Sequence, residues 1–141
     1  MPMNRETILR RALWTAAVFN LLGALLFAFP ASYFGQFAGL PAEVPGAYRA
    51  LTALFVLLFG GAYLWLAQQA VIDRALLTFG AIGKASAFAL IVILWLTGAA
   101  SGRGVLIASG DLILAALFIW CLRGGRPMAT GRAKATRLRA L

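Results

Sequence analysis

The sequence contains no histidine, a single cysteine and only four acidic residues among its 141 positions. One cysteine, Cys121, excludes an internal disulfide and the paired-cysteine chemistry of membrane thiol oxidoreductases. Without histidine a zinc or haem site is improbable, so we predict no metal and no cofactor. Nucleotide-binding loops, nucleophile elbows and carboxylate pairs spaced for hydrolysis are also missing. An enzyme is therefore the function class that these residues support least.

Charged residues of either sign are scarce. They make up 12% of the chain, whereas hydrophobic residues make up 62%. A soluble domain would carry about 25% charged residues, so the composition predicts a single membrane domain. The net charge of +9 does not indicate a nucleic-acid partner, because the basic residues stand at the ends of apolar segments.

Long apolar runs dominate what is present. Residues 12–29, 50–67, 75–97 and 105–122 are each long enough to cross the ~30 Å hydrocarbon core of a bilayer as a helix. We predict an all-α, four-helix transmembrane bundle formed by residues 1–122. A basic tail, residues 123–141, follows, and its composition predicts disorder. The first run resembles a signal peptide, but its 18 residues exceed the usual ~7–15, so we expect a retained helix.

The polar segments predict where helices start and stop. Asn4 is a suitable N-cap for a helix that begins near Arg5. Residues 30–49 contain three prolines and three glycines, which interrupt helical structure after the first span. We expect an aromatic-anchored loop there, and a short interfacial helix over Gly35 to Leu40 is the alternative.

Basic residues are distributed unequally between the two ends of the spans. Ten of the thirteen Lys and Arg residues lie in residues 1–11, 68–74 and 123–141, and two, Arg49 and Arg103, lie on the other side. This asymmetry predicts that both termini are cytoplasmic. The lipid bilayer is the expected partner. The tail either contacts anionic lipid or only fixes topology, and association with itself or with another subunit is left open.

A weak internal repeat suggests two hairpins. Residues 11–15 and 74–78 match at four of five positions, 63 residues apart. The first and third spans run in the same direction, so a repeat would be parallel, with its axis along the membrane normal. Coincidence is the alternative, because both stretches open a helix that starts at a basic residue. In this register Asn20 aligns with Gly83, next to Lys84.

Lys84 stands near the middle of the third run, where a lysine costs about 2.5 to 3.5 kcal/mol on insertion scales. Asp111 is the only acidic residue inside another apolar run. At about 1.5 Å per residue the two Cα atoms differ in height by about 8 Å, which a lysine side chain largely covers. We therefore predict a Lys84–Asp111 pair between antiparallel neighbouring helices.

Two further residues belong to the predicted site. Asn20 lies at the height of Lys84 in the first span, and Arg49 heads the second span, from which it could reach toward Asp111. Lys84, Asp111, Asn20 and Arg49 together predict a site for a small solute or a proton. The alternative is a purely structural Lys84–Asp111 pair in an accessory subunit that packs through Gly60–Gly61.

Several short motifs carry a resemblance. They are Phe19-Asn20, Phe29-Pro30, Gly39-Leu40-Pro41, Tyr48-Arg49, Gly83-Lys84 and Gly110-Asp111. Over residues 9–122 the chain resembles the small four-span proteins of unknown function that are common in bacterial inner membranes. This resemblance implies the fold and the membrane but no activity. The small multidrug exporters are similar only in size, because they need a glutamate in the first span, and the first span of this chain has none. The sterol-isomerase-like fold uses several intramembrane acidic residues, and this chain has one.

Overall fold

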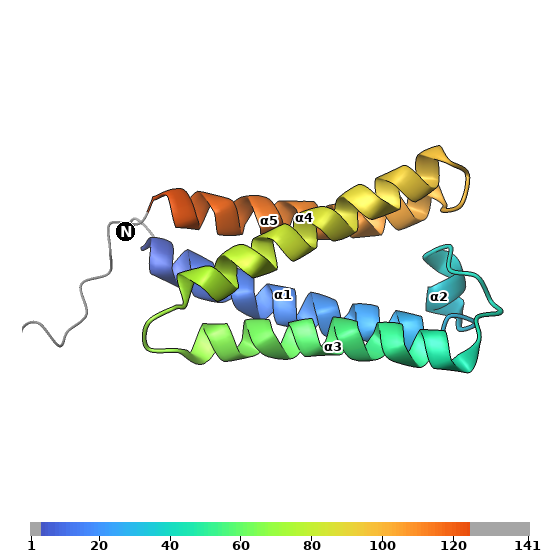
Figure 1. Ribbon diagram of the computed structural model, residues 1–141, viewed down its shortest axis with the longest axis horizontal. Helices are drawn as coiled ribbons and strands as arrows, with labels where there is room; N and C mark the ends of the chain where they lie inside the picture. Colours follow the sequence, from blue (N-terminus) through green and yellow to red (C-terminus); the bar gives the residue numbers. More distant parts are fainter. Residues whose placement is uncertain (1–3, 125–141) are drawn as a thin grey trace, which may run out of the picture.

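The computed structural model describes residues 4–124, so most of the tail that we expected to be disordered lies outside the described residues. Four long helices form a bundle: α1 (Arg5–Ala28), α3 (Gly46–Gln68), α4 (Arg74–Leu96) and α5 (Gly102–Arg123) (Figure 1). A short helix, α2 (Tyr33–Phe37), lies between α1 and α3. Each long helix is long and apolar enough to cross a membrane. The predicted all-α, four-helix membrane fold is confirmed.

Side-chain caps set the first residue of three of the long helices. The Asn4 side chain accepts a hydrogen bond from the backbone N–H of Glu6 (3.3 Å), which confirms the predicted cap. Asp73 accepts from the first turn of α4, and Ser101 from the first turn of α5. Because the caps stand in polar turns, the helices begin one to seven residues before the apolar runs that predicted them.

The segment after α1 is more ordered than expected. The Ser32 hydroxyl accepts from the backbone N–H of Gly35 (3.1 Å) and starts α2. A side chain at position 35 would collide with the backbone of Pro30, so glycine allows α2 to fold back against the end of α1. The expected simple loop is wrong, and the helix starts two residues before the alternative range. The aromatic rings of α2 are exposed: Tyr33, Phe34 and Phe37.

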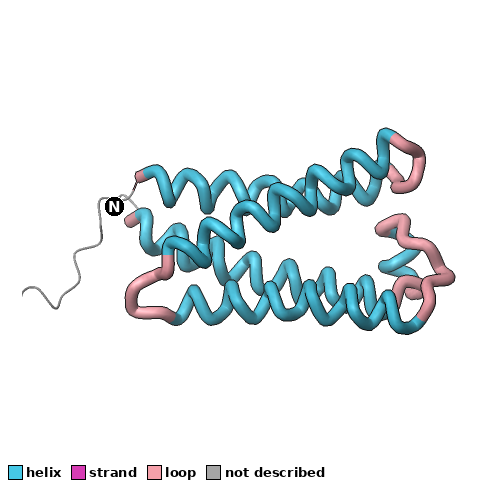
Figure 2. The backbone as a smooth tube through the Cα atoms, in the orientation of Figure 1, coloured by secondary structure: helices cyan, strands magenta, loops and turns pink. Residues whose placement is uncertain are grey.

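The four long helices pair as two hairpins. The most extensive contacts join α1 to α3 and α4 to α5, whereas α3 and α4 touch only briefly. Figure 2 shows the hairpins close together at the end that holds the start of α1, the end of α5 and the turn between α3 and α4. They diverge toward the opposite end, which holds α2 and the turn between α4 and α5. We call these the termini end and the loop end.

The contiguous apolar core lies in the half of the bundle at the termini end. Its largest buried side chains are Tyr63, Phe118, Leu13, Leu66 and Leu77. No residue of α4 after Lys84 is buried, and no residue of α3 before Gly60 is buried. Lys84 therefore lies at the boundary between this packed half and an open half toward the loop end.

Candidate functional site

Lys84 reaches the centre of the bundle and is 3% exposed. Its Nζ donates to Oδ1 of Asp111 (2.5 Å) and to Oδ1 of Asn20 (3.0 Å). The predicted Lys84–Asp111 pair is thus present, and Asn20 joins it. Helices α4, α5 and α1 meet at this one ammonium group, and its bond to Asn20 is a polar link between the two hairpins.

Two aromatic rings complete the surroundings of the ammonium. Nζ of Lys84 lies 5.3 Å from the ring centroid of Phe19 and 5.1 Å from that of Tyr63, both within range of a cation–π contact. The Tyr63 hydroxyl donates to the backbone oxygen of Gly80 (3.1 Å), which fixes the ring against α4. Sequence reasoning missed both rings. Tyr63 gave a usable signal, since it is the only tyrosine inside an apolar run.

Asn20 is fixed on both sides of its amide. Oδ1 accepts from Lys84, and Nδ2 donates to the backbone oxygen of Val56 on α3 (3.1 Å). Because each end of the amide has one suitable partner, its orientation follows from the hydrogen bonds. All four long helices therefore contribute to the cluster of Lys84, Asp111, Asn20, Phe19 and Tyr63, which we call the polar cluster.

Glycines allow this cluster to be compact, because each of three cluster side chains rests against a glycine of another helix. A Cβ atom would lie 2.8 Å from the Phe19 ring at Gly110, 2.7 Å from the Tyr63 ring at Gly80, and 3.2 Å from Cβ of Asn20 at Gly60. The first two distances are shorter than ordinary carbon contacts. Alanine at either position would push a ring away from Lys84.

Asp111 is less enclosed than its partner. Its side chain is 19% exposed, and among residues 4–124 no group donates to its second oxygen, Oδ2. Asp111 shares its helical face with Ala108 and Ala115, both of which are buried, so this face is turned into the bundle. The carboxylate therefore keeps capacity for one more hydrogen bond or a proton.

Arg49 is not part of the cluster. It is exposed in the first turn of α3, and the two ion pairs within the described residues join Arg10 to Glu6 and Lys84 to Asp111. The bond from Asn20 to the Val56 oxygen marks the level of the cluster on α3. Arg49 precedes Val56 by seven residues, which is about 10 Å along the helix, so its side chain starts too far toward the loop end.

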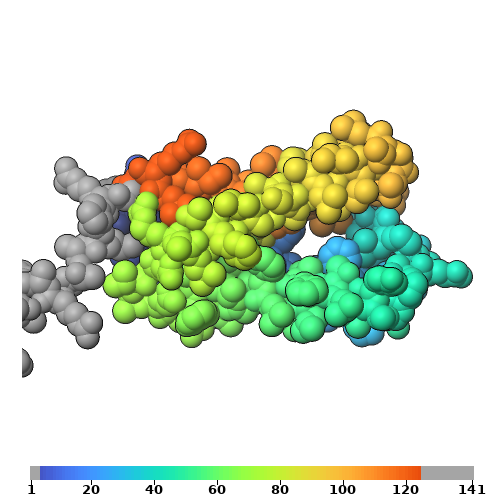
Figure 3. Space-filling view, viewed as in Figure 1, coloured from blue at the N-terminus to red at the C-terminus, as the bar shows by residue number. Residues whose placement is uncertain are grey.

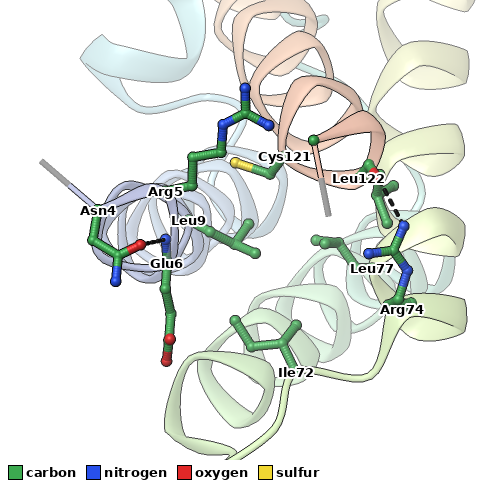
Figure 4. A pocket seen from close by; sticks show the side chains of 10 residues that line it. Asn4, Arg5, Glu6, Leu9, Ile72, Arg74, Leu77, Cys121 and Leu122 are labelled. Carbon is green, nitrogen blue, oxygen red and sulfur yellow. Dashed lines mark hydrogen bonds between the residues drawn. The ribbon is translucent and has the colours of Figure 1, made fainter. Parts of the chain in front are cut away.

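Two pockets lie away from the Lys84–Asp111 pair, and Phe19 of the polar cluster lines the second of them. One, of about 400 Å³, opens at the termini end between Arg5, Leu9, Arg74 and Leu122, where Arg74 donates to the Leu122 oxygen (Figure 4). The other, of about 380 Å³, runs along α1 and α5. Neither pocket is lined by Lys84 or Asp111. No three potential metal ligands of the His, Cys, Asp and Glu types lie together in residues 4–124.

The open half adjoins the cluster from the loop end. In Figure 3 a hollow separates the second half of α4, in yellow, from the first half of α3, in green to cyan, and α1 shows in blue beneath it. At the far end α2 approaches the start of α5, where the Arg103 guanidinium lies over the Phe37 ring (5.5 Å).

No known protein family, curated protein or solved structure matches this chain. Function is therefore inferred from the polar cluster itself.

Proposed function

We propose that this integral membrane protein binds a proton or a small solute at the polar cluster, with Asp111 as the accepting residue. One observation carries the proposal: Lys84 is enclosed on every side, whereas Asp111 is partly exposed on an inward face with one oxygen that accepts no hydrogen bond from residues 4–124. An ionisable pair inside a bilayer is costly, and such pairs commonly mark proton or solute sites.

The ligand chemistry follows from what is already satisfied. The Lys84 ammonium has two oxygen acceptors and two aromatic faces, so an incoming anion finds little room there. Oδ2 of Asp111 accepts, so the ligand presents a donor: a proton, an ammonium group or a hydroxyl group. A proton on Asp111 removes the charge that faces Lys84 and weakens that bond, while the bond to Asn20 stays. Ligand binding would thus alter the polar contact between α4 and α5 within the second hairpin.

The test is infrared spectroscopy of the purified protein in liposomes as the pH is lowered. Wild type is expected to gain the carbonyl bands of protonated carboxylic acids, and Asp111→Asn is expected to lack one of the components that wild type shows. Glu6→Gln, which removes a carboxylate at the termini end, is the control that should keep it. Failure of Asp111→Asn to remove any band over the accessible pH range would refute the proposal.

A structural role in a membrane complex is the second candidate, and two observations favour it. Every buried side-chain nitrogen and oxygen in residues 4–124 has a hydrogen-bond partner. Gly60 packs against α1, but Gly61 faces open space and is free to meet another helix. In this case Lys84→Met lowers the amount of folded protein without changing any proton-dependent property. If Lys84→Met accumulates normally and loses proton uptake, the site hypothesis is favoured.

We also propose that both termini are cytoplasmic, on the basis of the uneven distribution of Lys and Arg, and that the membrane is a bacterial inner membrane, as the resemblance over residues 9–122 implies. The test uses single cysteines in a Cys121→Ala background and a membrane-impermeant thiol reagent on intact cells. Ala42→Cys, in the loop after α2, should be labelled, and Ala70→Cys, in the turn before α4, should not. The reverse labelling pattern would mean that both termini lie on the opposite side of the membrane.

A further inference from the structure

In each hairpin one hydrogen bond of the cluster runs from a side chain of the first helix to the second helix. In the first hairpin Asn20 of α1 donates to the backbone oxygen of Val56 on α3. In the second, Lys84 of α4 donates to Asp111 of α5. Lys84 follows Asn20 by 64 residues, and Asp111 follows Val56 by 55 residues.

The same two offsets relate the buried residues of the hairpins. An offset of 64 places α1 on α4 and pairs buried residues: Leu13 with Leu77 and Ala16 with Gly80. An offset of 55 places α3 on α5 and pairs Gly60 with Ala115, Tyr63 with Phe118 and Leu66 with Cys121, which are all buried. The first hairpin has the larger separation because its connection holds α2.

The helix ends repeat as well. Arg10 of α1 donates to the backbone oxygens of Ala67 and Gln69 at the end of α3. Arg74, 64 residues after Arg10, donates to the oxygen of Leu122 at the end of α5, 55 residues after Ala67. In both hairpins an arginine of the first helix therefore satisfies the last carbonyl groups of the second helix.

Equivalent residues also touch each other. Lys84 bonds to its counterpart Asn20 (3.0 Å), and the ring of Tyr63 lies 5.7 Å from that of its counterpart Phe118. Residues related by a two-fold rotation meet their own counterparts only near the axis. Because α1 and α4 run in the same direction, this axis is parallel to the helices (Figure 1).

We infer that the chain is a fused pair of two-helix hairpins related by a pseudo-two-fold axis, and that Lys84 and Asn20 lie on it. Positions 20 and 56 are then a second seat for an ion pair, equivalent to positions 84 and 111. The register differs by one residue from that of the sequence repeat, so Asn20 corresponds to Lys84 and not to Gly83. This inference does not depend on the proposed proton or solute site.

The test relocates the ion pair across the axis. In a Lys84→Asn/Asp111→Val background, Val56→Asp places a lone acid in the bundle and is expected to lower the folded-to-unfolded ratio in detergent about a hundred-fold. Adding Asn20→Lys should then recover at least ten-fold of that loss, because the equivalent seat is complete again. Stability is the measurement, so the result is independent of whether Asp111 binds a proton.

The matched control adds Leu21→Lys in place of Asn20→Lys. Leu21 is the next residue on α1 but faces away from the bundle, so its lysine has no access to position 56. If Asn20→Lys recovers no more stability than Leu21→Lys, the two seats are not equivalent and the inferred symmetry fails.

Discussion

Glycine sets the distances around Lys84. The ring of Tyr63 approaches Gly80 so closely that a Cβ atom on residue 80 would lie 2.7 Å from the ring. A Cβ atom on Gly61, on the outer face of α3, would have no atom of another residue within 4 Å. Both glycines stand in helix interiors, where alanine has the higher helix propensity by about 0.5 to 1 kcal/mol. The sign of an alanine substitution is therefore decided by packing alone.

We predict that Gly80→Ala lowers the free energy of unfolding by about 1–3 kcal/mol, because the Tyr63 ring must move off its seat. Gly61→Ala is the matched control and should leave stability unchanged or raise it slightly. Reversible unfolding in mild detergent measures both. Equal effects of the two substitutions would mean that the close approach at Gly80 does not constrain the cluster.

At the scale of the helix, two arginines at the termini end each donate hydrogen bonds from one helix to backbone oxygens at the end of another. The last carbonyl groups of a helix lack partners inside it and carry a partial negative charge. Arg10 satisfies those of α3 and also pairs with Glu6, and Arg74 satisfies that of α5. In each hairpin these hydrogen bonds join the start of the first helix to the end of the second helix, opposite the connecting segment.

Arg10→Gln is expected to destabilise the protein by about 1–2 kcal/mol, since three backbone oxygens near the end of α3 lose a charged donor. Arg49→Gln removes an exposed arginine from the first turn of α3, where a positive charge is unfavourable, and should change stability by less than about 0.5 kcal/mol. Thermal unfolding of the two variants gives the comparison. Similar losses would contradict the capping role.

At the scale of the whole molecule, packing is uneven along the bundle. The contiguous apolar core lies on the termini-end side of Lys84, and toward the loop end the two hairpins diverge (Figure 2). If this open half is a route to Asp111, it holds water, whereas the packed half excludes it.

Single cysteines in a Cys121→Ala background test this in liposomes with a water-soluble thiol reagent. Phe88→Cys, in the second half of α4, is expected to react at least ten times faster than Leu114→Cys, which replaces a buried core residue of α5. Equal rates at the two positions would mean that lipid or protein fills the open half.

The four helices and the Lys84–Asp111 pair could be predicted because each depends on a property that can be read along the sequence. Apolar length predicts a span, and one cation and one anion inside hydrocarbon have few alternatives to meeting each other. Arg49 was assigned to the site from height and charge alone, and in the structure it lies outside the polar cluster. The Ser32 cap of α2 and the enclosure by Phe19 and Tyr63 were not anticipated, because they depend on contacts between segments.

The sequence by itself determined that this protein lies in a membrane, where its helices run, and that Lys84 and Asp111 belong together. Those properties follow from the free energy of transfer between water and hydrocarbon, to which each residue contributes according to its type and its position in the sequence. Only the tertiary structure decided which rings surround the ammonium, which carboxylate oxygen stays accessible and which residues of the two hairpins correspond. Those depend on how closely the helices approach, and at Gly60, Gly80 and Gly110 a single methyl group would change that distance.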